Sequence, residues 1–110
     1  MICHITTRQA WETAVTEREY NREKSPGYIP PSLSLEGFIH CSYPEQLIDT
    51  ARRYFRGQSG LVVLWIDPAR LTAELRVEET ATHSGSFPHI YGSLNLEAVV
   101  KVTEYNPDQE

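Results

Sequence analysis

The longest apolar stretch in the chain, Leu61 to Ile66, limits the possible folds more than any other segment. It is only as long as a strand, it is rich in branched and aromatic residues, and both of its faces are apolar. This pattern predicts a central β-strand that is covered on both sides, and Asp67 and Pro68 then end it. No stretch approaches the length of a bilayer span, so we expect no membrane partner.

Length and charge set further limits. A chain of 110 residues can bury one core but not two, so we expect one domain over residues 1–104 and a short tail over 105–110. The formal charge of -5 argues against long nucleic acid as a partner, because such binding depends on many cationic contacts. The first residues lack the basic and then apolar pattern of a signal peptide, so we expect a cytoplasmic protein.

Alternation and helical periodicity predict about six short strands and two helices, which is an α+β fold. The strands are expected near residues 1–6, 38–42, 61–67, 75–78, 87–92 and 99–104. The helices are expected near residues 8–16 and 44–56, each after a capping-box pair, Thr6 with Gln9 and Ser42 with Glu45. The polar segment from Glu17 to Glu36 is expected to be a long loop, which is either a binding loop or plain surface.

The short strand after Gly37 carries the first candidate site. Phe38, His40 and Ser42 would share one face, and the apolar Ile39 and Cys41 would share the other, which suits a core. An imidazole and a hydroxyl would then lie side by side just before a helix whose first N–H groups can bind an anion. The alternative is an ordinary hydrogen-bonded histidine.

A second histidine stands in a similar setting near the N-terminus. His4 lies between Cys3 and Ile5, as His40 lies between apolar neighbours. If the two strands belong to one sheet and their core faces align, His4 and His40 share a surface. The two cysteines, Cys3 and Cys41, lack metal-ligand spacing and fall on predicted core faces, so we expect buried, reduced thiols.

Two later segments add polar groups. Arg76 and Glu78 share one face of a strand, where each can set the orientation and charge of the other, although an exposed ion pair is the more common explanation. His89 and Tyr91 are two residues apart and point the same way if the chain is extended. His83 is interpreted as a loop surface residue. No pair of these residues has the spacing of a metal site, so we predict none.

The sequence contains no nucleophile elbow, phosphate-binding loop or dinucleotide fingerprint. Imidazoles, a carboxylate, an arginine and a tyrosine on non-core faces instead suit the binding of a polar small molecule that carries ribose hydroxyls and phosphates, with proton transfer as an option.

Residues 1 to about 104 resemble a bacterial family of uncharacterised domains, DUF952. The segments that carry the resemblance are Cys3 to Thr7, Gly37 to Ser42, Phe55 to Gly57, Asp67 to Leu71, Leu75 to Glu78 and Phe87 to Gly92. The family is similar in fold to ADP-ribosyltransferases, which implies a split pair of small mixed or antiparallel sheets that enclose a dinucleotide cleft.

The resemblance also implies positions for site residues. The transferases carry a His or Arg on the first strand, which His4 matches, and a polar residue on the second, which His40 with Ser42 would supply. Two histidines at these positions resemble the RNA 2′-phosphotransferase branch. The third position needs a late glutamate, and both Glu78 and Glu104 are candidates.

If that chemistry holds, His4 would orient a ribose and Tyr91 would stack on the nicotinamide. Arg76 or His89 would meet the pyrophosphate, and Glu78 would stabilise the oxocarbenium ion that forms as the glycosidic bond breaks.

The leading hypothesis is therefore an enzyme that acts on NAD or another ADP-ribose-containing small molecule, with NAD as substrate rather than as a bound cofactor. In that hypothesis His40 and Glu78 are the catalytic candidates. A non-catalytic nucleotide-binding module is the alternative, and RNA end processing of the 2′-phosphotransferase kind is the third possibility, against which the negative charge argues.

Overall fold

The computed structural model describes residues 1–20, 26–79 and 85–106, and it has an α+β architecture, as the sequence predicts. The described strands are β1 Ile2–Thr7, β2 Ile39–His40, β3 Leu61–Ile66, β4 Glu74–Glu79, β5 Ser86–Tyr91 and β6 Val99–Tyr105. The α-helices are α1 Arg8–Tyr20, α2 Pro31–Glu36 and α3 Leu47–Tyr54. Single 3-10 turns cover Pro44–Gln46, Pro68–Arg70 and Leu96–Ala98.

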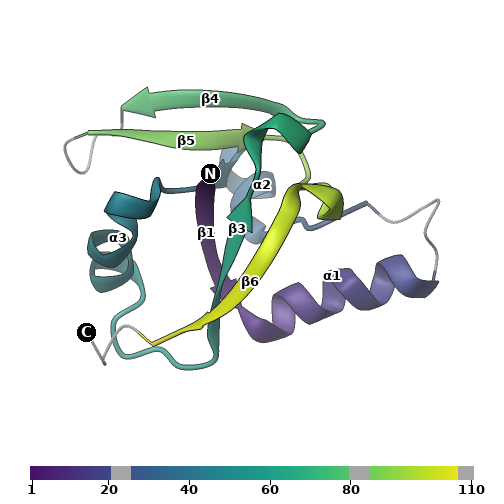
Figure 1. Cartoon of the computed structure of the whole chain (residues 1–110), viewed down its shortest axis with the longest axis horizontal. Coiled ribbons are helices and arrows are strands. Elements are labelled where there is room, and N and C mark those ends of the chain that lie inside the picture. The colour runs from purple at the N-terminus through teal and green to yellow at the C-terminus, as the bar shows by residue number, and fades with distance from the viewer. Residues whose placement is uncertain (21–25, 80–84, 107–110) are drawn as a thin grey trace.

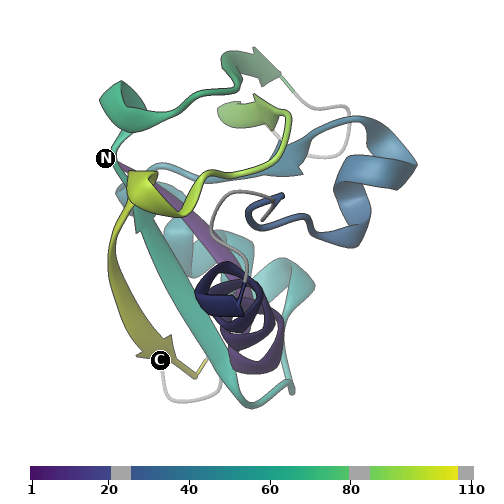
Figure 2. The same cartoon turned by 90° about the vertical axis from the view of Figure 1, so that its right-hand side faces the viewer.

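The strands form two antiparallel sheets of three strands each. The first sheet has the order β1-β3-β6, and the second has the order β2-β5-β4. In Figure 1 the strands of the first sheet run roughly vertically, and β4 and β5 lie across their upper end, an arrangement that Figure 2 shows from the side. The apolar segment that forms β3 is the central strand of the first sheet, as predicted, and every residue in it except the half-buried Trp65 is buried.

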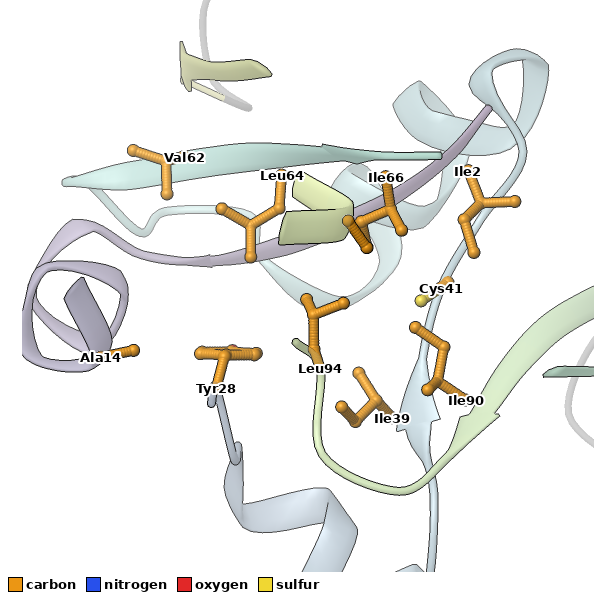
Figure 3. Close-up of a cluster of buried hydrophobic side chains, with 11 residues drawn as sticks. Ile2, Ala14, Tyr28, Ile39, Cys41, Val62, Leu64, Ile66, Ile90 and Leu94 are labelled. Atoms are coloured by element: carbon orange, nitrogen blue, oxygen red, sulfur yellow. The ribbon is translucent and has the colours of Figure 1, made fainter. Parts of the chain in front are cut away.

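The main core lies between the two sheets, and Figure 3 shows the side chains that meet there. Ile2, Leu64 and Ile66 extend from the first sheet, and Ile39 and Ile90 extend from the second. Burying an aliphatic side chain of this size contributes roughly 1.5–3 kcal/mol, so these contacts fix how the sheets pack. The expectation that the face of Ile39 belongs to the core is confirmed.

The opposite face of the first sheet packs on α3. Cys3 and Ile5 of β1 join Leu47 and Ala51 of α3 in a second buried cluster. Because both faces of β1 are covered, its polar residues His4 and Thr6 are buried too, and His4 is only 8% exposed. The sequence prediction that His4 lies on a non-core face therefore misses its burial, which alternation within β1 alone does not reveal.

The predicted helices are present, but their ends differ from the prediction. The helix predicted to end at Thr16 continues to Tyr20, and its first turn is capped by Thr7 rather than Thr6, since Thr7 Oγ1 accepts from Ala10 N–H. The helix predicted from Pro44 begins at Leu47, because the residues before it form a 3-10 turn.

The expected long loop contains a helix that the sequence analysis missed. α2 has Pro31 at its first position and ends at Glu36; the next residue, Gly37, has a φ of +86° and donates its N–H to Leu33 O. Proline at a helix start and glycine just past its end are common helix boundaries, so this signal was available in the sequence. His83 lies outside the described residues. In the described part of the chain, none of the helices is long and apolar enough to cross a membrane.

Candidate functional site

The two sheets are joined by one backbone bridge and diverge from it. Cys3 and Ser42 form an isolated antiparallel bridge, with N–O distances of 2.7 Å and 2.8 Å between their backbones. Beyond it, β1 continues in the first sheet and β2 in the second, so the condition for a shared surface, that both histidine strands lie in one sheet, is not met. The cause is that β1 pairs with β3 while β2 pairs with β5.

His4 lies across the split, the place where the two sheets diverge. Its Nδ1 is 2.6 Å from the backbone carbonyl oxygen of His40, which can only accept, so Nδ1 donates the hydrogen. Its Nε2 is 2.8 Å from the Tyr28 hydroxyl, which is also 2.7 Å from Thr6 Oγ1. Burial lowers the pKa of His4 to about 4. The ring is therefore neutral near pH 7.

His4 and His40 are in contact, but their two side chains do not share the surface of one sheet. The side chain of His4 contacts the backbone of His40, whereas the His40 ring is half exposed on the other side of β2. His40 Nε2 instead pairs with Glu36 Oε2 at the end of α2. Glu36 fixes the orientation of the imidazole, and a histidine oriented by a carboxylate is typical of proton-transfer sites.

Glu78 forms a second carboxylate and imidazole pair on the neighbouring strands. His89 Nδ1 donates to Glu78 Oε1 at 2.9 Å, and the Tyr91 hydroxyl donates to the same oxygen at 2.5 Å. These two bonds lower the pKa of Glu78, and the bond to Glu78 raises the pKa of Tyr91. The expectation that His89 and Tyr91 point the same way agrees with this geometry.

The predicted pair of Arg76 and Glu78 does not form. Its guanidinium donates to both carboxylate oxygens of Glu74, at 2.9 Å and 3.2 Å, and lies 4.3 Å from the centre of the Tyr91 ring. Because β4 alternates, Glu74 shares the face of Arg76 as Glu78 does. Because the Glu78 carboxylate already accepts from His89 and Tyr91, the Arg76 guanidinium pairs with Glu74 instead.

Phe38 connects the two carboxylate and imidazole pairs. Its ring stacks on His89 with centroids 4.2 Å apart, and it lies 4.8 Å from the His40 ring and 5.3 Å from the Tyr91 ring. The rings of His40 and His89 are 5.4 Å apart, edge to face. His40, His89, Tyr91 and Phe38 therefore form one aromatic cluster on the second sheet, with Glu36 and Glu78 at its sides.

Ser42 occupies a different place from the one predicted. It is buried, and its Oγ lies 3.0 Å from Thr50 Oγ1 on α3. The helix predicted to begin at Pro44 starts instead as a 3-10 turn, in which Gln46 N–H donates to Tyr43 O.

A large cleft of about 1490 Å³ connects these groups. Its described walls come from β1, α1, residues 26–32, the segment from Glu36 to Ser42, α3, β4 and β5. Among the predicted site residues it is lined by His4, His40, Ser42, Glu78, His89 and Tyr91. Arg76 does not line it, nor does Glu104, which lies on β6 and pairs with Arg8 at 2.6 Å. Within residues 1–20, 26–79 and 85–106 no three candidate ligands are grouped to hold a metal ion.

Comparison with known proteins assigns the family. Residues 5–102 match the family model described as a protein of unknown function, DUF952. The chain belongs to this family. No curated protein matches this DUF952 chain. Its fold is similar to the crystal structure of CC0527 from Caulobacter crescentus, with 30% sequence identity, a TM-score of 0.77, and coverage of 96% of this chain and 85% of that one.

The solution structure of CC0527 is similar as well. It has 28% identity and a TM-score of 0.66, and the alignment covers 96% of the DUF952 chain and 84% of CC0527. The likeness in sequence and fold therefore extends over almost the whole described chain.

Three residues of the DUF952 site were missed in the sequence. Tyr28 and Glu36 fall in the segment expected to be a loop, and Phe38 was placed on the right face without a role. A spacing of four residues between Glu36 and His40 was a signal, but α2 ends between them, so helical periodicity does not explain their contact. Tyr28 reaches His4 through long-range packing, which no local pattern encodes.

Proposed function

We propose that this protein is an enzyme that acts on NAD or another small molecule containing ADP-ribose, and that it breaks the glycosidic bond to the base. The observation that carries the proposal is the Glu78 carboxylate on the cleft wall, held by Tyr91 and His89 on one oxygen. A second argument is the resemblance of the split pair of sheets to the ADP-ribosyltransferase fold, in which a dinucleotide occupies the split.

The cleft has room for such a ligand. Its volume of about 1490 Å³ exceeds the roughly 300–1,000 Å³ of most small-molecule sites, which suits an extended dinucleotide. Both hydrogen bonds to Glu78 end on Oε1, so Oε2 can face a bound ribose. Phe38 and Tyr91 add flat aromatic surface beside it.

In the proposed reaction, the bond between ribose C1′ and the pyridinium nitrogen breaks, and its electron pair leaves with nicotinamide. The ribose becomes an oxocarbenium ion, whose positive charge the ionised Glu78 stabilises. An acceptor hydroxyl, or water, then forms a new bond to C1′ and loses its proton to His40. Glu36 keeps His40 oriented for that transfer.

His4 has a supporting part in this proposal. Its hydrogen bonds to Tyr28 and to the His40 carbonyl fix both walls at the start of the split. A neutral, buried imidazole at this place keeps β2 and its His40 at a constant distance from β1.

The experiment measures nicotinamide released from NAD by wild type, Glu78→Gln, His40→Asn and Glu45→Gln. Release should fall by about 10²-fold in each of the first two variants. Glu45 is exposed and does not line the cleft, so its variant should keep the wild-type rate. Unfolding midpoints of all four proteins control for folding.

Three other outcomes would change the proposal. Full activity of Glu78→Gln would remove this carboxylate from the mechanism, and loss of activity in Glu104→Gln would move the third position to Glu104. Stabilisation of wild type by NAD without release of nicotinamide would identify a nucleotide-binding module instead.

A further inference from the structure

In the described lining of the cleft, the charged side chains other than histidine all have the same sign. Besides the histidines, the charged residues in the described lining are Glu17, Glu36, Glu78 and Glu79. Lysine and arginine do not occur in that part of the lining. A cleft lined by one sign of charge concentrates ligands of the opposite sign, so these walls favour a cation.

The described walls offer a diphosphate no arginine or lysine side chain. Phosphate groups are usually bound by arginine or by clustered backbone N–H groups. Arg76 is the predicted phosphate ligand, but it does not line the cleft and both carboxylate oxygens of Glu74 engage it. The predicted role of Arg76 toward a pyrophosphate therefore finds no support in the geometry.

His89 gives a second and independent indication of a ligand. It is 3% exposed, it lines the cleft, and its Nε2 is buried without a hydrogen-bond partner among the described residues. Its Nδ1 carries the hydrogen, because the Glu78 carboxylate beside it accepts. In the neutral ring Nε2 is then an acceptor, and leaving it unpaired costs roughly 1–3 kcal/mol. A ligand N–H group would satisfy it.

The aromatic cluster supplies the matching surface. Phe38 is half-buried, stacks on His89 and lies 5.3 Å from Tyr91, so aromatic faces stand beside the Glu78 carboxylate. A flat cation gains both from stacking on such rings and from a nearby carboxylate. Negative charge, a buried acceptor and aromatic faces thus lie together at this end of the cleft.

We propose that the end of the cleft formed by Glu78, His89 and Phe38 selects ligands by positive charge and binds the cationic pyridinium ring of an oxidised nicotinamide nucleotide. The carboxamide N–H of that ring faces His89 Nε2. Recognition then depends on the ring rather than on the diphosphate. The choice of a nicotinamide ring rests on the proposed function, whereas the preference for a cation rests on the charges and contacts of the site.

Two small probes isolate the charge. 1-Methylnicotinamide and nicotinamide share the ring and the carboxamide, but only the first is a cation, and neither has a glycosidic bond to break. Titration calorimetry at low salt should give a Kd for 1-methylnicotinamide about tenfold lower than that for nicotinamide. ADP-ribose, which carries the diphosphate without the ring, should bind more weakly than 1-methylnicotinamide.

Variants test the residues. Glu78→Gln keeps the size of the side chain and should remove most of the preference for the cation, and Glu36→Gln should reduce it. The exposed Glu45→Gln should bind as wild type does, and the unfolding midpoint of each variant shows that it is folded. Equal affinity for the two nicotinamides, or tighter binding of ADP-ribose than of 1-methylnicotinamide, would overturn the proposal.

The outcomes separate this inference from the proposed function. If NAD is cleaved while the two nicotinamides bind equally, the proposed NAD-cleaving activity is supported and the proposed selection by charge is wrong. The opposite result is also informative. If the cation is preferred in a way that needs Glu78, but NAD is not cleaved, selection by charge is supported and the proposed NAD-cleaving activity is wrong.

Discussion

His4 of β1 donates a hydrogen bond from its side chain to the backbone carbonyl of His40 in β2, at 2.6 Å. The two strands leave their shared bridge one residue before His4, so the imidazole replaces the backbone bond that a continuous sheet would have had there. Its other nitrogen pairs with the buried Tyr28 hydroxyl, and the ring is only 8% exposed, so protonation would place a positive charge away from water. The start of the split therefore depends on the protonation of one buried residue.

This dependence predicts that acid destabilises the protein through His4. Burial lowers its folded pKa from 6.5 to about 4, so between these values the unfolded chain binds more protons than the folded one. The unfolding free energy should fall as the pH drops from about 7 to 4, by about 3 kcal/mol in total from this residue. Urea unfolding of wild type and His4→Gln at several pH values measures it as the difference between the curves. Parallel curves would mean that His4 is not buried and neutral.

Removing the Tyr28 hydroxyl should leave both Thr6 Oγ1 and His4 Nε2 without their hydrogen-bond partner. Tyr28 is 3% exposed, and burial raises its pKa to about 12, so it is a neutral donor at all ordinary pH values. Tyr28→Phe should lower the unfolding free energy by about 1–3 kcal/mol, because a buried acceptor then lacks a partner. Tyr20→Phe is the matched control, since Tyr20 is 89% exposed, and its effect should stay within about 0.5 kcal/mol. Similar losses in both variants would argue against the hydrogen bond.

Both thiols should resist modification in the folded protein. Cys3 and Cys41 are buried, and burial raises the pKa of Cys3 to about 11 and that of Cys41 further. Thiolate is the reactive form, so an aromatic disulfide reagent at pH 8 should label them at least about 10²-fold more slowly than an exposed thiol. Ser59→Cys supplies that exposed thiol on the same fold. Fast labelling of wild type would show that the native core opens readily.

Strand alternation and periodicity explain how much of this fold the sequence predicts. The central position of Leu61 to Ile66 and the burial of Ile39 follow from local patterns, because the two faces of a strand differ in hydrophobicity. The shared direction of His89 and Tyr91 is equally local. Each of these predictions needs only the two-residue repeat of a strand.

The remaining parts of the site depend on which segments pack together. No local pattern predicts that His40 pairs with Glu36 across the end of a helix. Nor does one predict that Arg76 pairs with Glu74 rather than Glu78, since that depends on which partners compete in space. The contact of His4 with a backbone rather than a side chain depends on where the two sheets separate. Such relations are non-local and leave no periodic signal.

A backbone bridge holds Tyr28 in contact with His4. Tyr28 and Leu94 form an isolated bridge with N–O distances of 2.9 Å and 3.0 Å, and Gly27 precedes it with a φ of +82°. A Cβ at Gly27 would lie 2.5 Å from the Leu94 carbonyl oxygen, whereas Gly57 has the same φ and open space around the same position. Gly57→Ala should therefore cost only the left-handed strain of about 1–2 kcal/mol.

Gly27→Ala should cost about 1–3 kcal/mol more than Gly57→Ala, because the added methyl group also pushes the bridge apart. Urea unfolding of the two variants measures this difference. Because the bridge positions Tyr28, the Gly27 variant should also raise the pKa at which His4 titrates, observed by NMR of its ring protons, while the Gly57 variant leaves it unchanged. Equal stability of the two variants would mean that the chain relaxes around Leu94, and that the bridge does not hold the tyrosine in place.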